Sequence, residues 1–170
     1  AVEIVPSRVT EEATVARTAA LLEGIGQVPL VVRKEIPGYV MNRLQAAVVG
    51  EAMHLVAEGV VAPEELDRAF PAALGWRWGF MGPFETMDLN AEGGFDAYVE
   101  RFGASYQKLT QTLRVDAPWR AEAIAAVAEA RRRAVPREAL PERRRWRDRL
   151  VRAVAALAGG SGSDTGSGRA

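Results

Sequence analysis

The pattern of apolar and polar positions changes near residue 36. Residues 1–5 (AVEIV) and 28–34 (VPLVVRK) are short, β-branched runs typical of strands. Between them, the chain from Thr10 to Gly24 or Gly26 has the acids and the glycine stop of a helix. Strand, helix and strand in this order predict one crossover unit, which normally belongs to a larger parallel sheet.

From Pro37 onward the spacing is helical, and the chain is predicted to be mainly α. Pro37 and Gly38 are expected to open the first of these helices, since proline suits a first helical turn. The predicted helices cover residues 38–59, 62–70, 83–91, 95–109, 118–134 and 139–158. Residues 74–82 are rich in glycine, proline and aromatic residues and are predicted to form a loop, and residues 159–170 a disordered Gly/Ser tail.

Composition excludes several classes of site. The chain has 170 residues, an apolar fraction of 48% and a formal net charge of zero. It has no cysteine, which excludes a disulfide framework, a thiolate nucleophile and a cysteine-type zinc site. No apolar run approaches the roughly 20 residues of a membrane span. Because the first residue is not Met and an isolated strand opens the sequence, we expect a chain cut from something longer.

The charge is unevenly distributed along the chain. Residues 1–130 hold 11 Lys and Arg against 18 Asp and Glu, whereas residues 131–152 hold ten arginines against three acids. The arginine-rich segment could bind phosphates of nucleic acid or of a large cofactor. Trp146, Leu150, Val151 and Val154 recur at helical spacing, and no nucleic-acid motif accompanies the charge. This pattern favours a docked amphipathic helix.

Asn42 is the first candidate for chemistry. On a helical wheel it falls within the apolar arc, near the start of the predicted 38–59 helix. A buried amide without partners costs about 1–3 kcal/mol, so Asn42 is expected either to bond a nearby carbonyl or to project into a ligand cleft. Satisfied buried amides are common, which favours the first interpretation from geometry alone.

Two charged residues are further candidates. Glu3 alternates with apolar residues in the first strand, and it is expected to be either a solvated edge carboxylate or the partner of a histidine base. The histidine of the chain, His54, falls on the predicted solvent face and is interpreted as a surface residue. Arg77 lies between Trp76 and Trp78, where a guanidinium stacked by aromatic rings could bind a carboxylate, form an ion pair or make a cation–π contact.

Motifs for other chemistries are missing from the sequence. Gly24 and Gly26 end a helix, whereas a phosphate-binding glycine loop follows a strand and opens a helix. The chain has no Ser-His-Asp set and no cluster of residues with metal-ligand spacing, so no metal site and no cofactor-binding residue is predicted within it.

Several segments together resemble one family. VEIVP, KEIPGYVMNRLQ, EA..LV.EGV and GPFE..DLN are similar to the 3-hydroxyacyl-CoA dehydrogenase family over roughly residues 1–150. The segments ALGWRWGFMGPFETMDLNAEGG and RRRWRD resemble a narrower branch, the L-gulonate 3-dehydrogenases, also called lambda-crystallins. The resemblance implies that residues 1–35 are the C-terminal remnant of a Rossmann-type NAD-binding domain, and residues 36–158 a helical substrate and dimerisation domain.

The resemblance also implies a mechanism. NAD accepts a hydride from C3 of a 3-hydroxy acid or acyl-CoA, while a histidine takes the hydroxyl proton. Glu3 then matches the glutamate that orients this histidine, Asn42 the asparagine that reaches the substrate and the histidine, and Arg77 a branch-specific arginine. A free carboxylate needs such a partner and a thioester does not, so Arg77 favours a small 3-hydroxy acid.

By the same resemblance, the histidine, the NAD loop and a substrate-binding serine lie before Ala1, so this chain alone is expected to be inactive and to leave Asn42 beside an incomplete cleft near Glu3. The complete protein is expected to be a cytoplasmic homodimer that joins through the helical domain, away from membranes and nucleic acid. Two alternatives stay open: a 3-hydroxybutyryl-CoA dehydrogenase fragment, or a non-catalytic dimerisation module.

Overall fold

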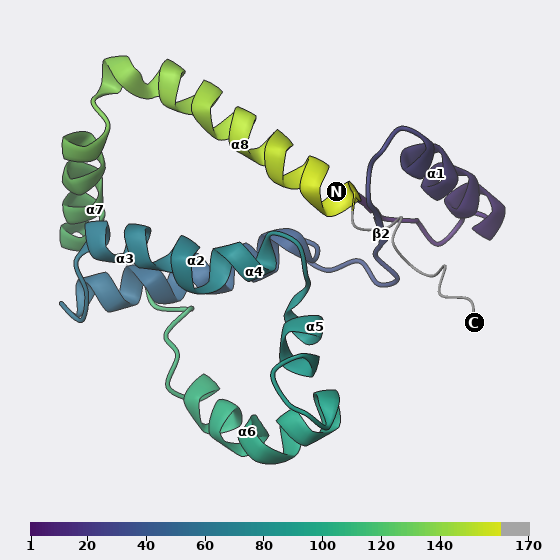
Figure 1. Cartoon of the computed structure of the whole chain (residues 1–170), viewed down its shortest axis with the longest axis horizontal. Coiled ribbons are helices and arrows are strands. Elements are labelled where there is room, and N and C mark those ends of the chain that lie inside the picture. The colour runs from purple at the N-terminus through teal and green to yellow at the C-terminus, as the bar shows by residue number, and fades with distance from the viewer. Residues whose placement is uncertain (161–170) are drawn as a thin grey trace, which may run out of the picture. The chain divides into compact units, whose positions relative to one another are not determined.

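The structure is a computed structural model that describes residues 1–160. The chain divides into two compact units, one from Ala1 to Glu51 and one that begins at Ala52 (Figure 1). The second unit is mainly helical, whereas the first combines helices with the strands of the described residues. This agrees with the predicted fold class, a helical domain preceded by a β-α-β element.

The first unit opens with the predicted crossover. Strand β1 (Val2–Ile4), helix α1 (Glu12–Gly24) and strand β2 (Pro29–Val31) follow one another, and the two strands pair in parallel with Glu3 opposite Leu30. A parallel pair requires a crossover connection, and α1 provides it. The strands are shorter than predicted, but their order and the helix between them are confirmed.

Helix α2 (Met41–Ala57) begins three residues later than predicted. Gly38 has a φ of +77° and Tyr39 a φ of +50°, so both lie in the left-handed region and cannot continue a right-handed helix. Residues 37–40 form a turn instead. The prediction that Pro37 and Gly38 open the helix is therefore wrong, because it took the proline signal without the backbone freedom of the glycine after it.

The second unit contains the predicted helices. They are α3 (Pro63–Phe70), α5 (Pro83–Asp88), α6 (Gly94–Thr110), α7 (Ala121–Ala134) and α8 (Leu140–Gly160), with the short 3₁₀ turn η2 (Arg137–Ala139) before α8. Proline occupies the first position of α3 and of α5, where its missing N–H has no consequence. Helix α3 contacts α7, and α5 contacts α6 (Figure 1). The remainder of the predicted tail, residues 161–170, lies outside the described residues.

The loop predicted at residues 74–82 is in part helical. A π-helical turn, η1 (Pro71–Gly75), continues α3 and leads into the helical turn α4 (Trp76–Trp78). The backbone N–H of Trp76 donates to the carbonyl of Pro71, five residues earlier. A glycine costs a helix only about 1 kcal/mol relative to alanine, so Gly75 does not end it. Arg77 consequently lies on a helix.

Two ion pairs link α3 to α7. Asp67 pairs with Arg131 at 2.8 Å, and Glu64 pairs with Arg133. The hydrogen bond from Arg133 holds the pKa of Glu64 below its usual value. These ion pairs join two helices that are in contact, although exposed pairs of this kind add little stability individually.

Few large side chains are fully buried in the described residues. The buried apolar residues are Val32, Tyr98, Ala123 and Ala130. The apolar stripe on α8 is exposed, with Trp146 at 39% and Val151 at 60%, so the helix forms as predicted but its predicted docking is wrong. Val154 approaches the end of α4, since its Cγ1 lies 3.5 Å from the position that a Cβ of Gly79 would have, but the stripe as a whole stays exposed.

Candidate functional site

The carboxylate of Glu3 forms hydrogen bonds with the backbone at the start of α2. Its Oε1 accepts hydrogen bonds from the backbone N–H of Val40 at 2.7 Å and of Met41 at 3.3 Å. The first N–H groups of a helix lack partners within the helix, and a negative charge at this end also interacts favourably with the helix dipole. Glu3 therefore ties β1 to the start of α2 and is half-buried, so it is not a solvated edge residue.

The second carboxylate oxygen of Glu3 has a different environment. Within residues 1–160, Oε2 accepts no hydrogen bond, whereas Oε1 is occupied by α2. A carboxylate that is fixed through one oxygen can still accept an N–H from another group through the other. The orientation of Glu3 is thus set by the backbone.

Asn42 follows Met41 on the first turn of α2, directly after the N–H groups that Glu3 accepts. It is exposed, so the predicted burial of its amide is wrong. The helical wheel assumes that the apolar arc is covered, but Leu44 of the same arc is also exposed, at 57%. The Cβ of Asn42 lies close to Gly38, 3.9 Å from the position that a Cβ would have there.

Arg77 carries an unsatisfied donor. Its Nε is buried and has no hydrogen-bond partner among the described residues. Leaving a buried donor unpaired costs about 1–3 kcal/mol, more for a charged group, so the site demands an acceptor. The Nε–H and one terminal N–H of a guanidinium form a fork that matches the two oxygens of a carboxylate.

The two tryptophans beside Arg77 do not stack on its guanidinium. The cation–π contacts in the described residues are made by Arg101 and Arg143, and Trp78 instead makes an edge contact with Phe70 at 6.4 Å between centroids. Neighbouring residues on a helix point about 100° apart and do not face each other. The stacking expected from the sequence order Trp-Arg-Trp is wrong because the segment is helical.

Two tyrosines of α6 form a hydrogen-bonded pair. The hydroxyl of Tyr98 donates to the hydroxyl of Tyr106 at 3.1 Å, and Tyr98 is only 8% exposed. The hydrogen bond to Tyr106 raises the pKa of Tyr98, while the positive charge of Arg77 acts in the opposite direction. Arg77 therefore lies within electrostatic reach of a buried hydroxyl. Neither tyrosine was a candidate, because no motif surrounds either of them in the sequence of α6.

The structure brings two of the three candidate residues together. Glu3 and Asn42 lie at the same end of α2 within the first unit, and Arg77 belongs to the second unit. His54 is half-buried, since it lines a narrow crevice with Pro118 and Trp119, so it is not the freely exposed residue that the wheel predicted. The crevice is formed by a segment distant in sequence.

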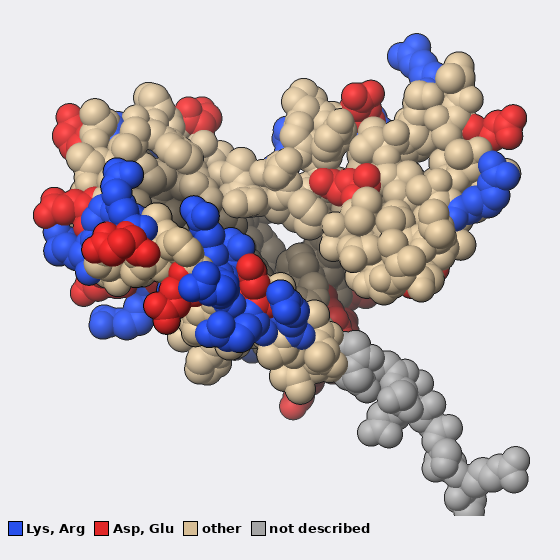
Figure 2. All heavy atoms as spheres, turned by 90° about the horizontal axis from the view of Figure 1, so that it is seen from above, with Lys and Arg blue, Asp and Glu red and all other residues tan. Residues whose placement is uncertain are grey.

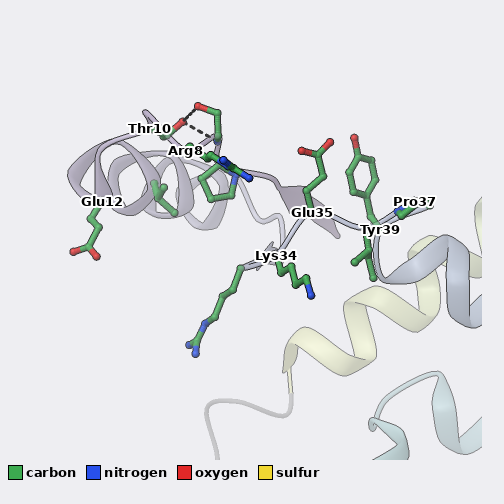
Figure 3. A pocket seen from close by; sticks show the side chains of 13 residues that line it. Arg8, Thr10, Glu12, Lys34, Glu35, Pro37 and Tyr39 are labelled. Atoms are coloured by element: carbon green, nitrogen blue, oxygen red, sulfur yellow. Dashed lines mark hydrogen bonds between the residues drawn. The ribbon is translucent and has the colours of Figure 1, made fainter.

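The first unit contains a groove that was not predicted from the sequence. It has a volume of about 910 Å³ and lies between the start of α1 and the connection from β2 to α2. Figure 3 shows Glu35 and Tyr39 extending from that connection, with Thr10 bonded to its neighbour at the other side. None of the three candidate residues lines the groove. Its walls carry both signs of charge, as Arg8 and Lys34 lie near Glu12 and Glu35.

The described residues do not form a cradle for NAD. The phosphates of a dinucleotide bind where a strand leads through glycines into a helix N-terminus, whereas Gly24 and Gly26 follow the C-terminal end of α1. In residues 1–160, no three His, Asp or Glu side chains are grouped so as to hold a metal ion. No helix in that part of the chain is both long and apolar enough to cross a bilayer.

Comparison with known families assigns the helical region. The family described as "3-hydroxyacyl-CoA dehydrogenase, C-terminal domain" matches residues 38–119. This region is thus similar to the C-terminal domain of the 3-hydroxyacyl-CoA dehydrogenases, a family of NAD-dependent oxidoreductases. The predicted resemblance is confirmed, and the match begins at Gly38, just before the helix that Glu3 caps.

Particular relatives narrow the resemblance. Lambda-crystallin from Oryctolagus cuniculus is 42% identical over 92% of this chain and 49% of its own length. The lambda-crystallin homolog from Homo sapiens is 41% identical over the same shares. L-carnitine dehydrogenase from Staphylococcus epidermidis is 40% identical over 63% of this chain and 34% of its own length. The chain thus spans about half the length of the lambda-crystallins that it matches.

A solved structure supports the same fold. The crystal structure of 5-formyl-3-hydroxy-2-methylpyridine 4-carboxylic acid 5-dehydrogenase, described as an NAD+-dependent dismutase, matches with a TM-score of 0.52 and 32% identity. The match covers 61% of this chain and 33% of that structure. Sequence and fold comparisons therefore point to the same class of enzyme.

Proposed function

We propose that this chain is the C-terminal part of an NAD-dependent dehydrogenase that oxidises the 3-hydroxyl of a small 3-hydroxy acid, as in L-gulonate 3-dehydrogenase. The observation that carries the proposal is the position of Glu3, which the N-terminus of α2 holds beside Asn42. Similarity to this family supports the reaction type. Residues 1–35 are proposed to be the end of the nucleotide domain and residues 36–158 the substrate and dimerisation domain.

Glu3 is proposed to orient the base. Hydride loss from C3 requires that a base remove the hydroxyl proton, and a histidine that does so becomes an imidazolium. The free Oε2 of Glu3 can accept the N–H of that histidine, fix its tautomer and stabilise its charge, while Oε1 stays bonded to α2. The proposed histidine lies outside this chain, and NAD bound there would accept the hydride.

Asn42 and Arg77 are proposed to bind the substrate. The exposed amide of Asn42, on the same helix turn that Glu3 caps, can donate a hydrogen bond to the substrate oxygen. The unpaired Nε of Arg77 would receive the carboxylate. The dismutase relative is named for a substrate with a carboxylic acid, which supports this class of substrate over a thioester.

A substrate comparison tests the role of Arg77. In the full-length gene product, Arg77→Ala is expected to lower kcat/KM for the free 3-hydroxy acid roughly 10- to 100-fold, because one charge-assisted hydrogen-bond pair is lost. The CoA ester of the same acid should change by a few-fold at most. Arg101→Ala, which removes an arginine that stacks on Phe102, is the matched control and should leave both values unchanged.

The same assay separates the alternatives. If kcat/KM for the free acid stays within a few-fold after Arg77→Ala, Arg77 does not bind the substrate carboxylate. That result would favour the 3-hydroxybutyryl-CoA dehydrogenase alternative. A non-catalytic dimerisation module would show no turnover in any arm. For the 170-residue chain alone, we expect no saturable NADH binding in a fluorescence titration, and detectable binding would contradict a nucleotide site outside it.

We also propose that the complete protein is a cytoplasmic homodimer that joins through the helical domain. Met41, Leu44 and Val48 form an apolar arc on α2 and are 45%, 57% and 39% exposed. An arc of this kind on a helix is more often covered than left in water. Its continuity with the turn that carries Asn42 would place the interface beside the substrate site.

A further inference from the structure

A cavity lies between the end of α7 and the first turns of α8, where no candidate residue was predicted. It has a volume of about 420 Å³, which lies within the range of small-molecule sites. Its lining includes the apolar residues Val135 and Pro136 and the ring of Trp146. The cavity lies wholly within the second unit, so its geometry depends only on α7, η2 and α8.

The charged lining of the cavity is mostly positive. Arg131, Arg143 and Arg149 line it against a single acid, Glu142. Arg131 is paired with Asp67, whereas neither Arg143 nor Arg149 has an acidic partner among the described residues. Figure 2 shows Lys and Arg side chains gathered on the visible face, with fewer acids between them. Two guanidiniums are therefore available to an anion.

Arg143 and Trp146 form a preorganised pair. The guanidinium carbon of Arg143 lies 3.4 Å from the centroid of the Trp146 ring. Stacking holds the guanidinium plane against the ring but leaves its N–H donors at the edge of the plane, where they can form two parallel bonds to a phosphate. An anion that binds here loses less side-chain entropy than on a mobile arginine.

We propose that this cavity binds an organic phosphate, with the phosphate on Arg143 and Arg149 and the organic group against Trp146, Val135 and Pro136. A phosphate fits the lining better than a monocarboxylate, because the two guanidiniums without an acidic partner outnumber the one carboxylate, Glu142, and a phosphate has enough oxygens to bond both. Nothing in the proposed dehydrogenase reaction uses these residues. The inference is independent of that reaction and predicts a second, separate ligand site.

Nucleic acid is a poorer match for the same arginines. Non-specific binding of a duplex uses an extended row of cations along many phosphates, whereas this site pairs a short, solvent-open pocket with one aromatic ring. Acidic residues interrupt the row of basic residues. They are Glu142 and Asp148 in α8 and Glu122 in the first turn of α7. A small phosphate ester fits the volume without this conflict.

Calorimetric titration of the 170-residue chain with ADP and with inorganic pyrophosphate tests the proposal. We expect saturable binding of ADP at one site per chain. The double variant Arg143→Ala, Arg149→Ala should weaken ADP binding about tenfold or more, the change expected for two lost charge-assisted contacts. Arg143→Lys keeps the charge without the fork and should weaken binding severalfold, with helicity monitored by circular dichroism.

Two further variants serve as controls for the binding experiment. Arg101→Ala removes an arginine that stacks on Phe102 in the same unit but outside the cavity, and it should leave the Kd unchanged within about twofold. Trp146→Ala should weaken ADP binding more than pyrophosphate binding, because ADP loses its ring contact in addition to the stacking that holds Arg143. The proposal is overturned if ADP does not saturate, if Arg101→Ala costs as much as Arg143→Lys, or if only duplex DNA binds, with steep salt dependence.

Discussion

At the scale of single residues, the carboxylate of Glu3 has a structural role that does not depend on any role in catalysis. It accepts two backbone N–H groups at the start of α2, across sequence separations of 37 and 38 residues. The strand that carries Glu3 is thereby fixed to the helix that carries Asn42. A substitution at Glu3 should consequently act on stability as well as on activity.

Replacing Glu3 with alanine should lower the free energy of unfolding by about 0.5–2 kcal/mol, the usual cost of removing an acceptor from a helix N-terminus. Urea unfolding followed by circular dichroism measures the change. Glu23→Ala removes an exposed carboxylate of α1 for which no side-chain contact is present, and it serves as the control. Equal losses for the two variants would mean that the cap contributes nothing.

The backbone of Gly38 is a second residue-scale test. Gly38→Ala should destabilise the chain by about 1 kcal/mol or more, because an alanine at a φ of +77° is strained. Gly24 has an ordinary φ and open space around its Cβ position, so Gly24→Ala should be neutral or slightly stabilising. Thermal unfolding measures the Tm of both variants. A Gly38→Ala protein as stable as Gly24→Ala would show that alanine is not strained in this turn.

At the scale of elements, the ion pairs between α3 and α7 make the second unit sensitive to acid. The folded-state pKa of Glu64 is lowered by Arg133, so its contribution to stability is present above the unfolded pKa, about 4.3. That contribution disappears as the pH falls through the folded pKa. Arg133, whose pKa is raised, stays charged throughout.

We therefore expect the Tm of the chain to fall between pH 6 and pH 3, and to fall less for Glu64→Gln, which has no such charge to lose. Differential scanning calorimetry at several pH values measures both. Glu100→Gln, on the exposed surface of α6, is the control and should follow the wild-type profile. Identical profiles for Glu64→Gln and Glu100→Gln would show that the Arg133 pair has no role in acid stability.

At the scale of the whole molecule, the exposed apolar side chains on α2 predict self-association. Leu44→Glu should weaken association about tenfold or more, because a charge in an apolar interface must be desolvated. Val9→Glu changes an isolated, 90% exposed position and should have no effect. Sedimentation velocity over about 1–100 μM measures the association of the wild type and both variants. A wild-type chain that stays monomeric over this range would contradict the dimer proposal.

The sequence by itself determined the elements and the family of this protein. Local spacing of apolar residues, prolines at helix starts and β-branched runs specify the crossover and the helices, since these signals act within one or two turns. The family followed from short segments such as PGYVMNR, which need no three-dimensional information. Glu3 and Asn42 could be named from that resemblance, although their roles stay proposals.

Tertiary structure alone decided what these residues contact. The bonds of Glu3 to α2, the unpaired Nε of Arg77 and the cavity beside Trp146 join segments whose proximity no local pattern encodes. The late start of α2 and the helical conformation of Arg77 were predicted wrongly, because left-handed φ angles and a π-turn depend on how the neighbouring helices continue. Burial of Asn42 failed for a related reason: a helical wheel identifies an apolar arc, but only packing determines whether anything covers it.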